Sequence, residues 1–252
     1  MIPKTIHYCW FGRNPLPETA QRCIASWRKF LPDYQIVEWN EDNFDVNAIA
    51  YTREAYAAGK WAFVSDYARF KILYEHGGIY FDTDVEVIAS MDDIIEAGPF
   101  MGYEIENQGS GNKVAPGLGL GVAPGLDLYA EILKFYDGLH FLMPDGSHNL
   151  TTVVIYITDI LIKHGLQPRP GKQTVAVVTI YPKDYFNPLD DNTGRLRITA
   201  NTRTIHWYSK TWLSEPRWRR VLSRWSHRVL GTRLIPAIKR RLSSQVAKLH
   251  FK

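Results

Sequence analysis

Two aspartates one residue apart, Asp82 and Asp84, follow the apolar run Ile79-Tyr80-Phe81 and the glycine pair Gly77-Gly78. In a strand, residues i and i+2 point to the same side, so both carboxylates should project together where the strand ends. Adjacent carboxylates repel each other unless a cation lies between them, and a hard divalent ion, Mg²⁺ or Mn²⁺, suits oxygen ligands. The spacing therefore predicts a divalent-metal site. The alternative for so short a motif is a solvated acidic turn.

A second pair of charges lies shortly before this turn, in the segment 61–74, which is apolar nearly all round and is therefore predicted to be a buried helix. Asp66 and Arg69 are three residues apart and share a face of that helix. Buried charges are costly unless they pair with each other or with a ligand. The pair is either an internal salt bridge or a binding site in which Asp66 accepts from sugar hydroxyls and Arg69 donates to sugar or phosphate oxygens.

The elements that must position these residues alternate between strand and helix. The apolar patterns and the Gly and Pro positions predict strands at 5–10, 34–39, 79–81, 85–88, 100–104, 117–122, 175–180 and 204–208. They predict helices at 18–30, 52–76, 126–136 and 151–164. This alternation indicates an α/β protein with a largely parallel central sheet. We expect one catalytic domain at 1–212, followed by a helical tail at 213–252.

Composition limits the class of protein. The chain has 252 residues, of which 45% are hydrophobic and 22% charged, as in ordinary globular proteins. No apolar run approaches the ~18 to 20 residues of a membrane span. Cys9 and Cys23 have no C-x-x-C spacing, and the N-terminal residues do not resemble a signal peptide. We therefore expect reduced thiols and a cytoplasmic location.

Two segments resemble a known family. Residues 2–12 (IPKTIHYCWFG) and residues 60–84, which include KWAFVSDYAR and GGIYFDTD, are similar to the DXD-motif sugar transferases. That family includes bacterial capsular-polysaccharide glycosyltransferases, yeast initiating α-mannosyltransferases and, more distantly, the large clostridial glucosylating toxins. The resemblance covers roughly the first ninety residues and is loose from about 107 to 201. It implies a GT-A fold, a Rossmann-like sheet that binds a nucleotide-sugar.

The resemblance also implies roles for individual residues. Trp10 matches the tryptophan that stacks on the nucleobase, a contact worth ~1 to 3 kcal/mol in nucleic-acid systems. Asp66 and Arg69 match the positions that hold the donor sugar. Asp82 matches the first aspartate, which meets the ribose or a metal-bound water, and Asp84 matches the direct metal ligand. The alternative for Trp10 is an ordinary core aromatic.

A late segment, IHWYSKTW at 205–212, is similar to the family's closing motif. The resemblance implies His206 as a third metal ligand, and imidazole suits Mn²⁺ better than Mg²⁺. It implies that Ser209 or Thr211 contacts the diphosphate and that Trp212 closes over the leaving-group oxygen. The family pattern more usually has serine immediately before that tryptophan, whereas this chain has Thr211, so the choice between the two hydroxyls stays open.

The activity implied is metal-dependent, retaining transfer of a hexose from a nucleotide-sugar to a glycan acceptor. UDP-sugars are favoured by the capsule resemblance, and GDP-mannose is the alternative donor. No nucleophile is evident in the sequence, so we prefer a front-face reaction in which the departing phosphate takes the acceptor proton. Glu104 and Glu106 are weaker candidates for acceptor contact. A nucleotide-sugar hydrolase and a non-catalytic membrane-binding module are the competing classes.

The charge distribution indicates a partner for the C-terminal end. Residues 210–252 carry twelve Lys or Arg and one Glu, which leaves residues 1–209 with 18 basic and 25 acidic side chains out of totals of 30 and 26. Val221, Leu222, Trp225 and Val229 form an apolar stripe beside arginines, as in helices that bind anionic membranes. Packing on the catalytic domain and dimerisation are the alternatives. A lipid-linked acceptor would place the protein at the inner face of the cytoplasmic membrane, and we expect no nucleic-acid partner.

Overall fold

The computed structural model describes residues 1–106 and 111–209. The chain divides into two compact units, the first made of Met1–Pro188 and Ile198–Trp212. Of the second unit, the structure describes Leu189–Arg197, a turn closed by an antiparallel bridge between Leu189 and Leu196. The predicted tail at 213–252 lies outside the described residues. Among those described, no helix combines the length and apolar character that a membrane crossing requires.

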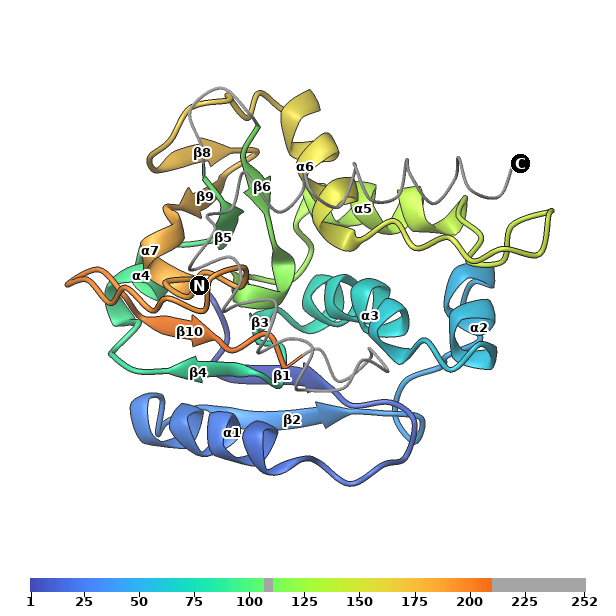
Figure 1. Cartoon of the computed structure of the whole chain (residues 1–252), viewed down its shortest axis with the longest axis horizontal. Helices are drawn as coiled ribbons and strands as arrows, with labels where there is room; N and C mark the ends of the chain where they lie inside the picture. Colours follow the sequence, from blue (N-terminus) through green and yellow to red (C-terminus); the bar gives the residue numbers. More distant parts are fainter. Residues whose placement is uncertain (107–110, 210–252) are drawn as a thin grey trace, which may run out of the picture. The chain divides into compact units, whose positions relative to one another are not determined.

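The first unit contains strands and helices in alternation (Figure 1). The strands of the main sheet are β1 (Thr5–Cys9), β2 (Gln35–Trp39), β3 (Gly78–Tyr80), β5 (Phe100–Ile105), β6 (Lys113–Val114), β7 (Leu120–Val122), β8 (Gln173–Val175) and β9 (Val178–Tyr181). A second, two-stranded sheet consists of β4 (Val85–Val87) and β10 (Thr204–His206). The helices are α1 (Glu18–Phe30), α2 (Ala50–Ala57), α3 (Trp61–His76), α4 (Asp92–Glu96), the 3₁₀ turn η1 (Pro116–Leu118), α5 (Asp127–Asp137), α6 (Val153–Lys163) and α7 (Lys183–Phe186).

The main sheet has the order β2-β1-β3-β7-β5-β9-β8, with β6 paired to β5. Strands β2, β1 and β3 are parallel, as are β5 and β9. Strand β7 is antiparallel to both of its neighbours, and β8 is antiparallel to β9. The predicted parallel arrangement therefore holds for the first three strands, and from β7 onward the sheet is mixed.

The two faces of the sheet belong to separate hydrophobic clusters. Because side chains alternate along a strand, Tyr80 packs with α3, α5 and α6, whereas Ile79 and Phe81 pack on the opposite face. Trp27 of α1 lies among the residues of that opposite face. In Figure 1, α1 (blue) accordingly lies on the other side of β1 from α3 and α5. Both clusters reach the end of β3, so the turn that follows it is anchored from two sides.

The glycine pair between α3 and β3 is required by both backbone conformation and space. Gly77 has φ +63° and Gly78 has φ +100°, values that side chains other than glycine rarely adopt. A Cβ at Gly78 would also come within 2.6 Å of the carbonyl oxygen of Thr5, and one at Gly77 within 2.7 Å of Pro124. The pair therefore sets how closely β3 can approach β1.

Three sequence predictions need correction. The helix expected at 52–76 is two helices, α2 and α3, because Gly59 adopts φ +66° between them. The strand expected at 175–180 is the hairpin β8–β9, whose turn residues Ala176 and Val177 both have positive φ. The segment expected as a strand at 117–122 begins as η1 and becomes extended only at Leu120.

Candidate metal and donor site

The Asp82–Asp84 turn lies between β3 and β4, at the C-terminal end of β3. Its first residue donates its backbone N–H to the carbonyl of Gly117 at 3.1 Å, and Val85 N–H closes the turn on the carbonyl of Asp82 at 3.0 Å. β3 is parallel to β1, so the turn lies at the carboxyl end of two adjacent strands, where α/β sheets bind ligands. The sequence prediction of a turn that follows a strand is correct.

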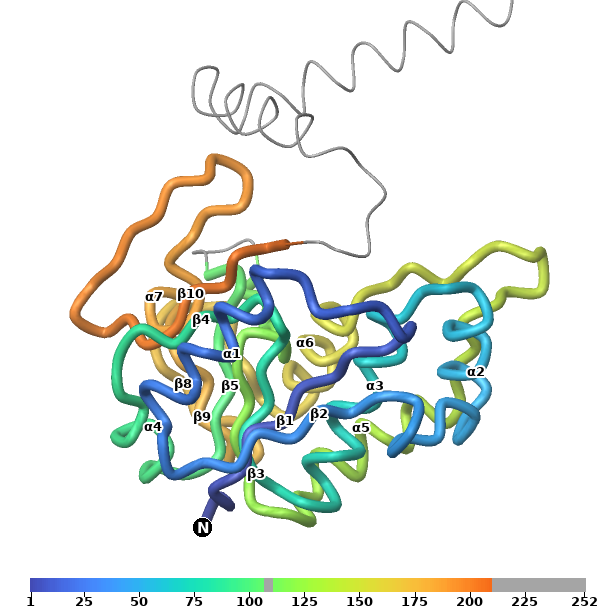
Figure 2. Tube along the Cα trace, turned by 90° about the horizontal axis from the view of Figure 1, so that it is seen from below, coloured from blue at the N-terminus to red at the C-terminus, as the bar shows by residue number. Residues whose placement is uncertain are grey.

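Strand β4 is fixed by contacts on both sides. On one side, the indole N–H of Trp27 donates to the carbonyl of Val85 at 2.7 Å, and Ser26 Oγ accepts from Val87 N–H at 2.9 Å. On the other side, β10 pairs antiparallel with β4 and places His206 opposite Val85. Figure 2 shows β10 beside β4. This pairing brings a residue from late in the chain next to Asp84.

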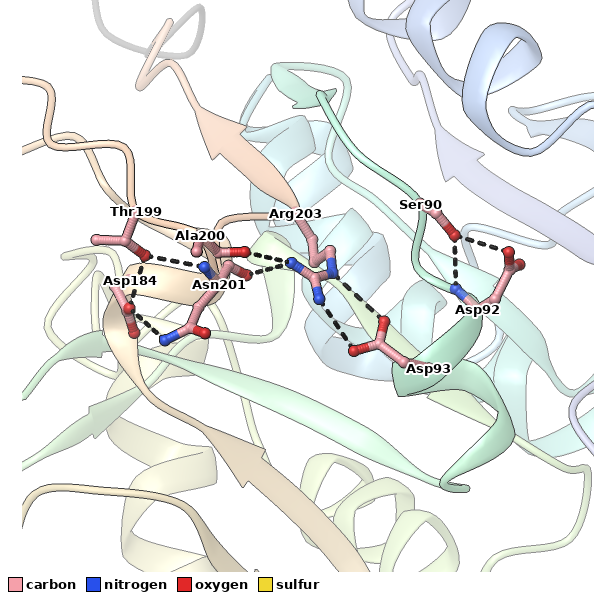
Figure 3. Close-up of polar contacts among 8 residues, drawn as sticks. All are labelled: Ser90, Asp92, Asp93, Asp184, Thr199, Ala200, Asn201 and Arg203. Carbon is pink, nitrogen blue, oxygen red and sulfur yellow. Dashed lines mark hydrogen bonds and ion pairs between the residues drawn. The ribbon is translucent and has the colours of Figure 1, made fainter.

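A network of polar contacts holds the segment that leads into β10 (Figure 3). The guanidinium of Arg203 contacts both carboxylate oxygens of Asp93, at 3.3 and 3.0 Å, and donates to the carbonyls of Ala200 and Asn201. Asp184 accepts from the hydroxyl of Thr199 and from the amide of Asn201. These contacts tie 199–203 to α4 and α7, so β10 starts from a fixed position.

Three potential metal ligands meet at this place: ligand atoms of Asp82, Asp84 and His206 lie within 4.8 Å of one another. Nε2 of His206 is 3.1 Å from Oδ1 of Asp84. Two ligands on adjacent corners of an octahedron with bonds of about 2.1 Å are about 3 Å apart, so this spacing suits Mg²⁺ or Mn²⁺. The structure thus brings together the three residues predicted to bind metal, and their role as ligands stays a prediction.

The electrostatics of the cluster fit an added cation. Burial would raise the pKa of Asp84, but His206 and hydrogen bonds from Ser209 hold it well below its usual range. Asp84 is therefore ionised at neutral pH. Nδ1 of His206 is buried and has no hydrogen-bond partner among the described residues, which is unusual for a buried polar atom. A cation would neutralise the carboxylates, and either imidazole nitrogen is a suitable donor.

Asp66 and Arg69 form the buried salt bridge that the sequence allowed. Nη2 of Arg69 lies 2.8 Å from Oδ1 of Asp66 and 3.4 Å from Oδ1 of Asp82, so the guanidinium joins α3 to the turn. Burial raises the pKa of Asp66 to about 6 despite the nearby guanidinium. Burial would lower the pKa of Arg69, but the carboxylates of Asp82 and Asp66 raise it overall. The pair is thus adjacent to the turn, as expected, and its contact with sugar stays a prediction.

Two tyrosines that the sequence analysis missed also contact the cluster. The hydroxyl of Tyr80 donates to Oδ1 of Asp82 at 3.1 Å, and its ring lies under the Arg69 guanidinium at 5.0 Å. The i, i+2 relation of Tyr80 to Asp82 on one strand was the available signal. Tyr208 packs its ring 4.2 Å from that of His206 and adopts φ +50°. No sequence pattern signals that conformation.

Trp10 lies just beyond β1 and is half-buried. Its indole N–H donates to the carbonyl of Asn14 at 2.6 Å, and the ring packs at the edge of the α1-side cluster. Nearby, the ring of Trp61, 37% exposed, lies so close to Gly12 that a Cβ there would come within 2.6 Å. Two partly exposed indoles therefore flank the loop after β1. Stacking of a base on Trp10 stays a prediction.

The structure describes some of the remaining candidate residues and not others. Ser209 is described, and its backbone N–H and hydroxyl both donate to Asp84, at 2.7 and 2.9 Å. Thr211 and Trp212 lie outside the described residues. The carboxylate of Glu106 accepts backbone N–H groups of Gly171 and Lys183, at 2.6 and 2.9 Å, so it joins the loop at Gly171 to the start of α7, and its contact with an acceptor stays a prediction. Glu104 is half-buried on β5 and stays a candidate for acceptor contact.

The sheet and its DXD turn define the fold class: an α/β protein of the GT-A type. Residues 17–101 match the family model of a glycosyltransferase sugar-binding region containing a DXD motif. Inositol phosphoceramide mannosyltransferase 1 of Schizosaccharomyces pombe is 29% identical over 111 residues, 40% of this chain and 33% of that protein. Inositol phosphoceramide mannosyltransferase 3 of the same yeast is 31% identical over 98 residues, 37% of this chain and 27% of that protein. These matches support the predicted DXD-motif glycosyltransferase family.

A solved structure has a similar fold. The PaToxG glycosyltransferase superposes with a TM-score of 0.50 at 18% sequence identity, over 64% of this chain and 69% of that one. The predicted GT-A-type fold is therefore confirmed. The curated relatives are matched over about a third of their length or less.

Proposed function

We propose that this chain is a metal-dependent retaining glycosyltransferase that moves a hexose from a nucleotide-sugar to a glycan acceptor. One observation carries the proposal: Asp82, Asp84 and His206 converge within 4.8 Å beside the buried Asp66–Arg69 pair. A salt bridge alone would explain Asp66 and Arg69. It would not explain why a strand from the far end of the chain brings an imidazole to the same turn.

The charges at this site explain why a cation is needed. Three carboxylates, those of Asp66, Asp82 and Asp84, face one guanidinium and one imidazole. A diphosphate would not enter so acidic a site without additional positive charge. Mn²⁺ or Mg²⁺, held by Asp82, Asp84 and His206, supplies that charge at the leaving diphosphate when bound.

The chain's own residues then bind and orient the donor. Arg69 is fixed by Ser65 and Asp66, so its charge is preorganised for an oxygen of the donor at no further cost in side-chain entropy. Asp66 accepts from sugar hydroxyls, and Trp10 stacks on the base. Ser209 or Thr211 contacts the diphosphate, and Trp212 closes over the leaving oxygen. We infer retention of anomeric configuration by a front-face reaction.

The donor is a UDP-sugar or GDP-mannose. The resemblance to capsule transferases supports a UDP-sugar, whereas the names of the two yeast relatives support a mannosyl donor. Those names also identify a ceramide-containing acceptor, which supports a lipid-linked acceptor here. We place the protein at the inner face of the cytoplasmic membrane, held peripherally by the basic residues after 212, with a role in capsular or surface polysaccharide synthesis.

Product analysis with a panel of UDP-sugars and GDP-mannose, each with Mn²⁺ and with chelator, tests this function. We expect one donor to give a glycosylated acceptor only with metal, and Asp84→Asn to lose that product. Asp33→Asn, an exposed aspartate paired with Lys4, is the matched control and should behave as wild type. Release of free sugar at a rate independent of acceptor would favour a hydrolase instead. Membrane binding unaffected by Asp84→Asn, with no turnover on any donor, would favour a binding module.

A further inference from the structure

The backbone of η1 lies directly against the carboxylate of Asp82. Gly117 accepts the backbone N–H of Asp82 at 3.1 Å. A Cβ built on Gly117 would overlap Oδ2 of Asp82, would lie 2.8 Å from its Cγ, and would come within 3.3 Å of Nη1 of Arg69. No side chain fits at position 117 while the Asp82 carboxylate keeps its place.

Conformational freedom does not explain this glycine. Gly117 is not among the residues with positive φ, whereas Gly119, two residues later, has φ +150°. Gly119 therefore needs glycine for its backbone conformation, and Gly117 needs it for space. The three atoms nearest to an added Cβ at position 117 all belong to Asp82 and Arg69.

The backbone at Gly117 cannot easily withdraw. Its neighbours Pro116 and Leu118 are buried, and Leu118 N–H bonds to the carbonyl of Ala115 at 3.3 Å. Ala115 N–H in turn bonds to the carbonyl of Gly102 on β5 at 3.1 Å. The Asp82 side chain is more exposed, at 31%. A side chain at 117 should therefore displace the carboxylate rather than the backbone.

The orientation of that carboxylate has a clear consequence for ligand binding. Oδ1 of Asp82 is taken by the hydroxyl of Tyr80 at 3.1 Å and by Arg69 at 3.4 Å. In the described part of the chain, no side chain or backbone group donates to Oδ2. The carboxylate is therefore held at Oδ1 by Tyr80 and Arg69 and packs at Oδ2 against the backbone of Gly117, so its orientation depends on both sides.

We propose that Gly117 is a positioning residue for the metal site: by having no side chain, it leaves room for the Asp82 carboxylate to lie within 4.8 Å of the ligand atoms of Asp84 and His206. The inference rests on the proposed function, because it assigns that site to a metal. It adds a residue from outside the strand and helix motifs. Gly117 contacts neither cation nor donor itself and acts through Asp82.

The test compares Gly117→Ala with Gly138→Ala, measuring Mn²⁺ affinity by calorimetry with UDP and with GDP. Gly138 is a suitable control because its φ is −88° and the nearest atom to an added Cβ is 3.7 Å away. We expect Gly117→Ala to keep the wild-type circular dichroism spectrum and to weaken Mn²⁺ binding at least tenfold, and Gly138→Ala to bind as wild type. Equal affinity in Gly117→Ala and Gly138→Ala would overturn the inference.

A second measurement separates this inference from the proposed function. If the clash with Asp82 is the cause, Gly117→Ala should lower Tm less in an Asp82→Ala background than in wild type, because the carboxylate is gone. Strictly additive Tm losses would contradict the inference. If wild type binds no Mn²⁺ with any nucleotide, the proposed function fails, whereas the coupling between Gly117 and Asp82 can still be present in the unfolding data.

Discussion

Ser209 donates two hydrogen bonds to a single oxygen of Asp84, from its backbone N–H at 2.7 Å and from its hydroxyl at 2.9 Å, across 125 residues of sequence. His206 meets the other oxygen at 3.1 Å. The side chain of the carboxylate that the DXD motif places at the centre of the site is therefore oriented by His206, the last residue of β10, and by Ser209, which follows that strand. The turn contributes the charge, and the returning strand sets its direction.

Replacing Ser209 tests that orientation. Ser209→Ala removes one charge-assisted hydrogen bond, worth about 1.5 to 3 kcal/mol, although the backbone N–H still donates. We expect Mn²⁺ affinity to fall about tenfold or more and Tm to fall by several degrees. Ser209→Thr keeps a hydroxyl and should retain most of the affinity. If both variants bind Mn²⁺ as wild type does, Asp84 is not oriented by this residue.

Removing the buried guanidinium should destabilise the fold itself. Arg69 is 4% exposed and pairs with Asp66 and Asp82, so Arg69→Met leaves the buried carboxylate of Asp66 and the partly exposed one of Asp82 without this partner, at a cost of about 3 to 5 kcal/mol. Urea unfolding measures this loss. The double variant Arg69→Met/Asp66→Asn should recover part of it, because one of the two charges is then gone. A loss below about 1 kcal/mol for Arg69→Met would show that the pair is not buried as described.

Acid should destabilise the protein through His7, whose side chain is hydrogen-bonded to Trp39 and Gly77 rather than to the proposed metal ligands. Nδ1 of His7 accepts from the indole of Trp39 at 3.0 Å, and Nε2 meets the carbonyl of Gly77 at 3.0 Å. The neutral imidazole can accept from the Trp39 indole at Nδ1 and donate to the Gly77 carbonyl from Nε2. A protonated ring would carry a hydrogen on Nδ1 as well, and that hydrogen would face the indole N–H, so this hydrogen bond would be lost. Burial accordingly lowers the pKa of His7 from 6.5 to about 4.

The sign follows from proton binding. Between pH 6.5 and 4 the unfolded chain binds a proton at His7 and the folded chain does not, so the free energy of unfolding falls as the pH falls through this range, by about 3 kcal/mol in all. Urea unfolding at pH 7, 5.5 and 4.5 measures it. In His7→Gln, which has no titrating group there, this part of the pH dependence should vanish. An unchanged pH profile in that variant would assign the effect to other groups.

The ion pair that anchors the segment before β10 should contribute little to stability. Asp93 is 60% exposed on its side chain, and exposed pairs are typically worth up to about 1 kcal/mol. We expect Asp93→Asn to lower the free energy of unfolding by less than about 1 kcal/mol. A change above about 2 kcal/mol would indicate that the contact is buried in solution.

The local elements were predictable where proline or glycine marks the end of a helix or strand. Helix α1 has the predicted bounds because Pro17 precedes it and Leu31-Pro32 ends it, and the glycine pair locates the end of α3. The long-range features were harder. The pairing of β10 with β4 depends on tertiary contacts with α1 and α7, and His206 was placed near Asp84 only through the family resemblance. Gly117 carries no local signal, since its requirement comes from a carboxylate 35 positions earlier in the chain.

Calorimetric titration of Mn²⁺ and nucleotide diphosphate into the full chain tests the central claim most directly, with wild type, Asp84→Asn, His206→Gln and the control Asp33→Asn compared in parallel. We predict that UDP or GDP binds wild type and Asp33→Asn only when Mn²⁺ is present, and that Asp84→Asn and His206→Gln each lose at least tenfold in that metal-dependent affinity. Nucleotide binding that is equally strong with chelator, or that is unchanged in both site variants, would contradict the assignment of a metal and donor site to Asp82, Asp84 and His206.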